Sequence, residues 1–544
     1  MLKGEAVLHR SVESSNPTNV EEPNSDGWWT FVEQDRFWKG LLIFGIFLNL
    51  WIASTSALGH DTHVRLAMDD DGILPWGHTR PIDTQANDPS YSPSSDGWNT
   101  DLVTTGGEGM VRIISMMWML LLMGVAGAII CIGRNSNEEK GSSKWNLRVA
   151  ALVAIYPTFI FSTGRGYQEP VVALFLLLAI VPQLLKIAEK NLVNRTGATV
   201  ISMFFFGGIL TAKSVPLEYS LVFGAALMLL FGLDHFAPHL RKVTRKPLVT
   251  SSLAGGGVAA IMLVWGATGG GGTLSVIADE PIRFGFALLI SIFDLVVVYA
   301  LFGMVLWPFV GAAITRLREI EDLDCSFLLA IIAGLTSALI VYVAALWTYE
   351  SVRWNAEWPW VMWTMGNNGR YISLVMVPVL ILLARLNQLD DTMPSLEKTG
   401  DKMKSVALGL ILVVPISMLA AFHGQTFWVD DAGEYLSDNM EDGEDFLFVD
   451  DATLGMHDLY VFHTEISLDD PRNITGHWRS PDSGWEVELS EEQNLPNRGN
   501  LSRVQWIVLA PEITWDMPSE WNMVKSGKAD YLNGGGEWQI WTNQ

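Results

Sequence analysis

The densest group of side chains that could do chemistry lies in ALGHDTHVRLAMDDDG, residues 57–72, where a long apolar run ends. This segment contains His60, Asp61, His63 and Arg65. A carboxylate such as Asp61 would lie in water at a membrane edge, within reach of a lipid headgroup. A general base belongs there if an acceptor hydroxyl is to attack a membrane-anchored sugar phosphate. A hydrated loop in which Asp61 caps a helix is the alternative interpretation.

An acidic triplet follows in the same segment, at Asp69, Asp70 and Asp71. Carboxylate oxygens can hold a divalent cation such as Mg²⁺ or Mn²⁺, so the triplet is a candidate metal site, with solvation of a loop as the alternative. The two cysteines of the chain, Cys131 and Cys325, lie at the ends of apolar runs. This placement favours inert helix residues over a disulfide or a metal-binding pair.

Composition places these segments in a membrane protein. Of the 544 residues, 49% are hydrophobic and 17% are charged, against about 25% charged residues in ordinary soluble domains. The apolar residues form runs of roughly 18–22 residues, long enough for a helix to cross a hydrocarbon core. We therefore predict an α-helical polytopic membrane protein with about eleven crossings, at residues 37–58, 111–133, 147–163, 170–188, 198–212, 217–236, 251–268, 285–315, 326–348, 371–386 and 405–424. The run 285–315 is too long for one perpendicular span, so it is either a tilted helix or an interfacial helix followed by a span.

Charge orients these helices and excludes one class of partner. Nearly all basic loop residues fall in alternate loops: Arg134, Lys140, Lys144, Arg148, Lys186, Lys190, Arg195, Arg241, Lys242, Arg245, Lys246, Arg316, Arg318, Arg385, Lys398, Lys402 and Lys404. The positive-inside rule puts these loops and the N-terminus in the cytoplasm. An odd number of crossings then puts the C-terminal tail on the extracytoplasmic side of the cell membrane. The formal net charge of -24 argues against nucleic acid as a partner.

Three regions follow from this layout. Residues 1–36 form a cytoplasmic N-terminal segment, residues 37–424 form a transmembrane domain whose large first outer loop covers 59–109, and residues 425–544 form an acidic extracytoplasmic domain. The last region holds 24 acidic and 6 basic residues, and such an excess of charge favours solubility. It is expected to be β-rich or α/β, with a helix at 431–440 and strands at 446–450, 459–466, 485–489 and 504–513.

The segment HDTHVRLA, residues 60–67, resembles the D-E-x-x-(Y/R/F)-x-x-A pattern of the GT-C superfamily of polyprenyl-phosphate-sugar-dependent glycosyltransferases. The likeness is to the protein-mannosyltransferase and aminoarabinose-transferase branches, in which a first helix runs into an acidic segment before a large outer loop. Asp61 matches the first acidic position, whereas Thr62 replaces the second. The resemblance implies that Asp61 is the catalytic base.

Three further segments resemble the same superfamily. They are GNNGRYISLVMVPVLILLARL (366–386), GGILTAKSVPLEYSL (207–221) and STGRGYQEPVVALFLLLA (162–179). The resemblance implies that Arg370 and Lys213 meet the phosphate of the donor, because a guanidinium binds phosphate oxygens in a bidentate manner. It also places Arg165, Tyr167 and Glu169 in a short outer loop, with Arg165 as a third phosphate ligand.

Each of these residues also has a structural interpretation. Arg370 and Arg165 could be interfacial anchors that reach for headgroups, and Glu169 could cap a helix N-terminus. A lysine on the outer side, such as Lys213, runs against the positive-inside rule and so points to function. Asp294 lies inside an apolar run, as functional carboxylates do, unless that run splits. Four tryptophans are interpreted in the first place as an aromatic belt at the outer interface, and only in the second place as a surface on which a sugar stacks: Trp354, Trp358, Trp360 and Trp363.

The function expected from the residues and the resemblance is inverting transfer of a sugar at the outer face of the membrane. A polyprenyl-phosphate-linked sugar is the donor, and the acceptor is a hydroxyl of a glycan, a lipid or a protein. A non-catalytic membrane scaffold with a partner-binding outer domain is the main rival. A transporter would carry ionisable residues near the middle of broken helices and would need neither the large loop nor the tail.

Overall fold

The structure is a computed structural model that describes residues 28–66, 100–129, 139–185, 188, 191–213, 215–270, 272–353, 358–364, 367–389, 400–422, 427–451, 458–467, 474–490, 501–516, 518–530 and 535–544. The acidic triplet Asp69–Asp71, Cys131, Trp354 and most of the expected outer loop lie outside these residues. Cys325 is fully buried in a helix, as expected from its apolar surroundings.

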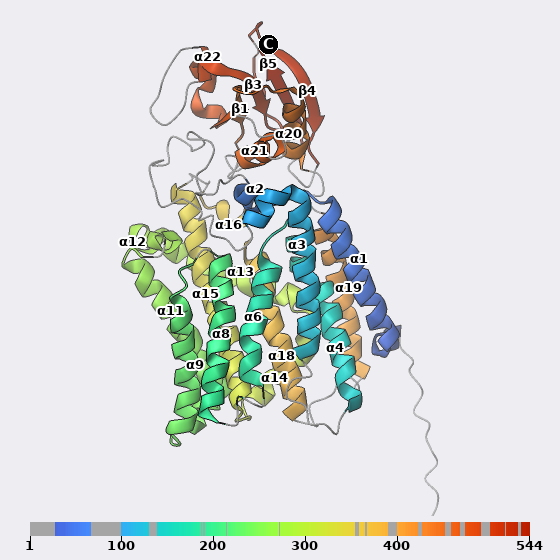
Figure 1. The fold of residues 1–544 in the computed structure, drawn as a ribbon, viewed down its shortest axis with the longest axis vertical. Helices are drawn as coiled ribbons and strands as arrows, with labels where there is room; N and C mark the ends of the chain where they lie inside the picture. Colours follow the sequence, from blue (N-terminus) through green and yellow to red (C-terminus); the bar gives the residue numbers. More distant parts are fainter. Residues whose placement is uncertain are drawn as a thin grey trace, which may run out of the picture.

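Nine helices in the described part of the chain are long and apolar enough to cross a membrane. They are α1 (Asp35–Thr55), α3 (Thr100–Ile129), α8 (Leu192–Ala212), α9 (Tyr219–Phe236), α11 (Pro247–Ala267), α13 (Pro281–Phe302), α15 (Leu323–Arg353), α18 (Ser373–Leu389) and α19 (Gly400–Phe422). Each coincides with one of the predicted apolar runs, and together they form a bundle (Figure 1). Short helices lie at its ends: α2 (His60–Leu66), α10 (Arg241–Thr244), α12 (Val276–Asp279), α16 (Val361–Thr364) and α17 (Asn367–Tyr371).

Two of the predicted runs form less regular elements. The run 147–163 is a pair of helices, α4 (Glu139–Ala154) and α5 (Pro157–Gly164), bent by 53° at a break before Pro157. The break frees backbone carbonyls inside the bundle, where water cannot satisfy them. Asn49 of α1 donates to the carbonyl of Ala154 at 2.8 Å, and Ser417 of α19 donates to that of Ile155 at 2.5 Å. The run 170–188 contains α6 (Glu169–Leu184), which at 16 residues is shorter than the other spans.

The run 285–315 differs from both predicted arrangements. It is a span, α13, followed after a break at residues 303–306 by the short helix α14 (Trp307–Leu317). The order is therefore the reverse of an interfacial helix that precedes a span. Asp294 stays within α13, so the break does not bring it to the end of that helix.

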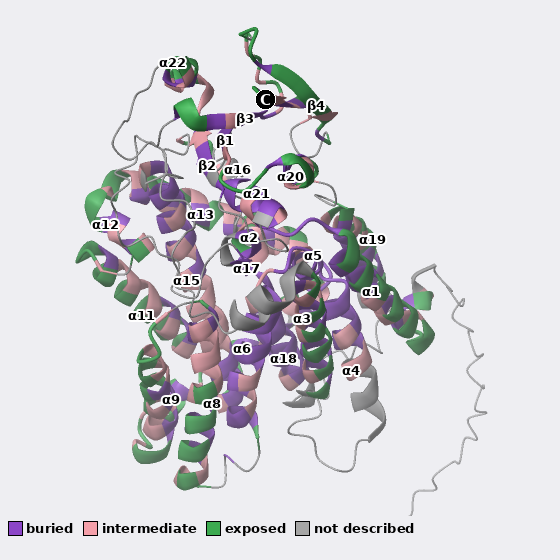
Figure 2. Ribbon diagram, turned by 45° about the horizontal axis from the view of Figure 1, so that its top comes forward, coloured by how far each residue is buried: buried purple, intermediate pink, exposed green. Residues whose placement is uncertain are grey.

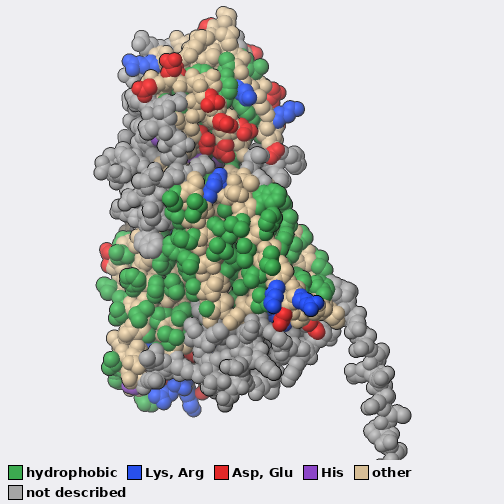
Figure 3. Space-filling view, turned by 45° about the vertical axis from the view of Figure 1, so that its right-hand side comes forward, with side chains coloured by type: hydrophobic (Ala, Val, Ile, Leu, Met, Phe, Trp, Pro, Cys, Tyr) green, Lys and Arg blue, Asp and Glu red, His purple; other side chains and the backbone are tan. Residues whose placement is uncertain are grey.

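The outside of the bundle is apolar, as the lipid-facing surface of a membrane protein must be. Large apolar side chains such as Phe204 and Ile282 are 75% and 89% exposed. Figure 2 shows that the exposed residues follow the outward faces of helices such as α9 and α11, around a buried interior. In Figure 3 hydrophobic side chains cover this face of the bundle, acidic side chains gather on the C-terminal region, and lysines and arginines appear near the opposite end. The described chain is thus compatible with a polytopic membrane protein.

The C-terminal region is an α/β unit on a five-stranded sheet. The strands are β1 (Asp445–Val449), β2 (Thr475–Arg479), β3 (Val504–Leu509), β4 (Asn522–Lys528) and β5 (Glu537–Thr542). Their order is β2-β1-β3-β5-β4, with β1 parallel to β2 and β3 and the other neighbours antiparallel. Helices α20 (Trp428–Asn439) and α21 (Asp458–Ser467) pack on one face, where Phe446, Phe448 and Trp506 are buried.

Two of the strands expected in this region are helices instead. The segment 459–466 belongs to α21, where Leu459, Phe462 and Ile466 are buried at the spacing of a helix. The segment 485–489 belongs to α22 (Trp485–Ser490), where Trp485 and Glu488 are buried and Val487 is exposed. Aromatic and β-branched residues favoured strands in both places, but tertiary packing decided otherwise. The expected helix 431–440 and the strands at 446–450 and 504–513 are confirmed as α20, β1 and β3.

Candidate functional site

Arg370 lies at the centre of a charged cluster at the end of the bundle that faces the α/β unit. Its Nη1 is 2.9 Å from Oδ2 of Asp61, and its Nε is 3.1 Å from Oε1 of Glu169. Lys213 Nζ lies 3.7 Å from the same Glu169 oxygen. The structure therefore brings together four of the predicted site residues, which come from four different parts of the chain.

Two tyrosines line the guanidinium of this cluster. The Cζ atom of Arg370 is 4.5 Å from the ring centroid of Tyr167 and 4.9 Å from that of Tyr371, and Nη2 donates to the Tyr371 hydroxyl at 2.9 Å. Lys213 Nζ is 5.9 Å from the Tyr371 ring. Aromatic faces attract cations, so both tyrosines help to hold the positive charges in place. Burial, followed by the charge of Asp61, raises the pKa of Tyr167 to about 12, which keeps its hydroxyl neutral.

Helix ends deliver these side chains to one place. Glu169 is the first residue of α6, where a carboxylate suits the helix dipole and Pro170 fits the first turn. Lys213 is the residue that ends α8, and Arg370 lies in α17 directly before α18. Side chains at the ends of helices can be polar without entering the apolar interior of the bundle.

The two carboxylates of the cluster differ in their exposure. The side chain of Glu169 is 2% exposed, whereas that of Asp61 is 60% exposed. Glu169 is thus a fixed counter-charge for Arg370 and Lys213. Removing one member of a buried ion pair is costly, because the other charge is then left without a partner. Asp61 is the partner that an incoming anion can displace from Arg370.

The loop between α5 and α6 fixes the backbone of α2. The carbonyl of Arg165 accepts from the N–H of Gly59 at 3.0 Å and from the hydroxyl of Thr62 at 2.9 Å. A Cβ at Gly59 would lie 2.3 Å from the Tyr167 ring, and Gly166 adopts a φ of +67°. Glycine suits position 59 because it has no Cβ, and it suits position 166 because it adopts a positive φ without strain.

The side chain of Arg165, the third predicted phosphate ligand, is buried. Its side chain is 7% exposed, and its Cζ lies 3.9 Å from the Phe161 ring centroid. Burial lowers the pKa of its guanidinium to about 10. Its backbone carbonyl holds α2 in place. Among the described residues, Arg370 and Lys213 are the cations that pair with Glu169.

The histidines that flank Asp61 face the α/β unit. His60 Nε2 lies 2.9 Å from Oδ1 of Asp458, and His63 Nδ1 lies 2.6 Å from Oγ1 of Thr464. Arg65 belongs to α2, but its side chain lies outside the described residues. The part of the chain that the structure describes holds no group of three or more His, Cys, Asp or Glu side chains suited to a metal ion, and Asp69–Asp71 lie outside it.

Some members of this neighbourhood were not singled out in the sequence. Thr464 lies in the segment 459–466, which was predicted as a strand, and Asp458 directly precedes it, so no pattern connected them to Asp61. Tyr371 was visible only as the second residue of the R-Y pattern. Glu350, near the end of α15, is 9% exposed, and its Oε2 has no hydrogen-bond partner among the described residues.

Residues of the expected aromatic belt pack against the outer helices. The ring of Trp358 lies 5.4 Å from the Arg283 guanidinium and 6.0 Å from the Phe286 ring, and Trp360 is 61% exposed.

Comparison of the whole chain with protein families, with curated proteins and with solved structures finds no match. The chemistry of the site must therefore be inferred from its own residues. It offers two cations beside a buried carboxylate, and one exposed carboxylate within 2.9 Å of the arginine.

Proposed function

We propose that this chain is an inverting glycosyltransferase of the GT-C type. It moves a sugar from a polyprenyl phosphate to an acceptor hydroxyl at the extracytoplasmic face of the membrane. The observation that carries the proposal is the ion pair of Arg370 with the exposed carboxylate of Asp61, beside Lys213. Asp61, Arg370 and Lys213 come from three separate segments, each of which resembles this superfamily.

The donor phosphate takes the place of Asp61 at Arg370. A phosphate offers oxygens to both Nη1 of Arg370 and Nζ of Lys213, while Glu169 keeps both cations in position. This exchange frees the Asp61 carboxylate a few Å from the anomeric carbon. The loaded site thus holds its base and its leaving-group ligands side by side.

The reaction is then one displacement. Asp61 takes the proton of the acceptor hydroxyl as that oxygen forms a bond to the anomeric carbon. The bond between this carbon and the phosphate oxygen breaks, and its electron pair leaves with the polyprenyl phosphate. Negative charge grows on that phosphate in the transition state, where Arg370 and Lys213 stabilise it.

The charge distribution supports the proposed orientation. Arg245 and Asp234 form a bidentate pair where α9 meets α10, and Arg385 pairs with Asp322 and Asp324 at the start of α15. Both groups lie at the end of the bundle opposite to the α/β unit (Figure 1). Basic residues favour the cytoplasmic side, so the site and the α/β unit face outward.

The test compares cell-surface glycans and glycolipids by mass spectrometry. Cells that lack this protein are complemented with the wild type or with Asp61→Asn. We expect one sugar to be missing without the protein, to return with the wild type and to stay missing with Asp61→Asn. Restoration by Asp61→Asn would favour a non-catalytic scaffold, in which the charged cluster merely ties the helices together.

A further inference from the structure

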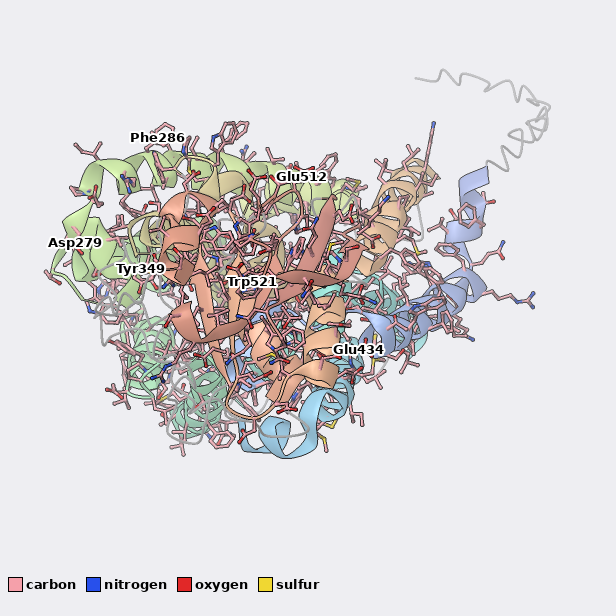
Figure 4. The ribbon with its side chains drawn as sticks, turned by 90° about the horizontal axis from the view of Figure 1, so that it is seen from above. Asp279, Phe286, Tyr349, Glu434, Glu512 and Trp521 are labelled. Carbon is pink, nitrogen blue, oxygen red and sulfur yellow. The ribbon has the colours of Figure 1, made fainter. Side chains whose placement is uncertain are left out.

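The helix that carries Asp61 is held between the bundle and the α/β unit. Helix α2 has seven residues, and isolated helices shorter than about 12–15 residues are marginal in water. Its position must therefore come from its neighbours. Figure 1 shows α2 at the end of the bundle, directly below α21, and Figure 4 shows from above that the part of the α/β unit around Trp521 overlies the middle of this end.

The two sides of α2 make different contacts. His60 and His63 are three residues apart, so they share one face of the helix. Both meet α21, through Asp458 and Thr464. Asp61 is rotated by about 100° from His60 and meets Arg370 instead. A single turn of helix thus joins the α/β unit to the charged cluster.

The contact with the α/β unit is mostly buried. His63 is 1% exposed, Thr464 is 4% exposed and Asp458 is 6% exposed. The Phe427 ring, at the start of α20, lies 5.6 Å from the ring of His60. The His60 side chain is 34% exposed, so the contact is open to solvent on that side and closed around His63. Two polar contacts fix the helix better than one, because a rotation of α2 would break both.

We infer that the C-terminal α/β unit is part of the catalytic apparatus: Asp458 and Thr464 are positioning residues that hold α2 through His60 and His63, and thereby place the Asp61 carboxylate. The inference rests on the proposed function, because it names what orients the base of that reaction. A displacement of a reacting group by about 1 Å can cost a hundredfold in rate, so a held helix matters.

One of the two contacts depends on pH. The charged groups that act on His60 are Asp458 of α21, Asp61 of α2 and Arg165 of the α5–α6 loop, and His63 lies on the same face. Burial opposes the charged form of His60, but Asp458 and Asp61 outweigh it and raise the pKa of this imidazole. The His60–Asp458 pair is therefore complete at low pH and weakens as the pH rises through that raised pKa. Burial lowers the pKa of His63 to about 3, so its contact with Thr464 is unchanged above that pH.

Hydrogen–deuterium exchange of the full-length protein in nanodiscs measures how firmly α2 is held. The variants are Asp458→Asn and Thr464→Val, with Thr464→Ser as the conservative replacement and the exposed Glu434→Gln of α20 as the control (Figure 4). We expect α2 amides to exchange about tenfold faster in Asp458→Asn and in Thr464→Val, because local opening becomes easier. Thr464→Ser and Glu434→Gln should match the wild type. Corrected for intrinsic rates, wild-type exchange should rise with pH through the His60 titration, and Asp458→Asn should lose this step.

Function supplies the second measurement. The same variants are scored for sugar transfer in complemented cells and for binding of polyprenyl phosphate alone. We expect transfer to fall about tenfold to a hundredfold in Asp458→Asn and Thr464→Val, with polyprenyl phosphate binding unchanged. Unchanged α2 exchange, or faster exchange with full transfer, would overturn the inference. Full transfer by Asp61→Asn would instead overturn the proposed function, and this result is read from the glycans and not from exchange.

Discussion

Asp61 and Arg370 are separated by 309 positions in the chain, and their side chains meet at 2.9 Å. The contact joins α2, which follows the first apolar helix α1, to α17, which directly precedes α18. It is partly open to water, because the Asp61 side chain is 60% exposed. An exposed ion pair contributes little to stability, so this one is suited to being opened by a ligand.

Asp61→Asn should lower sugar transfer steeply while leaving donor binding intact. The amide keeps the size of the side chain but cannot accept a proton, so the loss appears only in the transition state. We expect transfer to fall about 10²–10⁴-fold, the usual contribution of a general base. Transfer assays and polyprenyl phosphate binding on the same purified protein check this. Transfer at the wild-type level in Asp61→Asn would contradict the role of Asp61 as the base and the proposed function with it.

Arg370→Lys should lower transfer and should weaken polyprenyl phosphate binding. An ammonium group cannot reproduce the fork that meets Asp61 and Glu169 at once. We expect a loss of about 10²–10³-fold in transfer, as for other groups that stabilise a developing charge. Binding and turnover of the variant test this, with Arg283→Lys, at the outer helices, as the matched control. Equal effects at both arginines would indicate a general loss of structure.

Removal of the Arg370 charge should destabilise the bundle unless Glu169 is neutralised with it. Arg370→Gln leaves the 2% exposed carboxylate of Glu169 with Lys213 alone, at 3.7 Å. Breaking a buried pair in this way costs about 3–5 kcal/mol. The double variant Arg370→Gln/Glu169→Gln should recover most of that loss, as measured by thermal unfolding in detergent. Additive losses in the double variant would show that the two side chains are not coupled.

The α/β unit should be accessible from outside the cell. In a background without Cys131 and Cys325, Glu434→Cys should react with an impermeant thiol reagent on intact cells. Lys242→Cys, in α10 at the other end of the bundle, should react only after the cells are opened. The opposite pattern would reverse the proposed orientation and remove the site from the extracytoplasmic face.

A buried histidine, His63, and a half-buried one, His463, should make the protein less stable in mild acid. Burial lowers the pKa of His63 to about 3 and that of His463 to about 4. Between these values and the ordinary pKa of about 6.5, the unfolded chain binds more protons than the folded one, so stability falls as the pH falls. At pH 5 the cost from His63 is about 2 kcal/mol. Thermal unfolding at pH 7 and pH 5 measures it, and His463→Gln should reduce the difference.

The helices of the bundle could be predicted from the sequence because each apolar run is long enough to cross a membrane by itself. A helix satisfies its own backbone, so its existence depends on local composition. The acidic tail was recognisable in the same way. The helix ends that carry Glu169, Lys213 and Arg370 also followed from the ends of the runs, since a polar residue there needs no distant partner to be placed.

Contacts between distant segments were decided only by the tertiary structure. The sequence could not pair Arg370 with both Asp61 and Glu169, because spacing along the chain carries no information about which helix ends meet. The tail segment 459–466 has strand-like composition, yet it folds as a helix because Leu459, Phe462 and Ile466 pack against the sheet at helical spacing. That helix places Asp458 and Thr464 on α2. Local propensity is worth a fraction of a kcal/mol per residue, whereas burying one large apolar side chain is worth about 1.5–3 kcal/mol, so packing prevailed where the two disagreed.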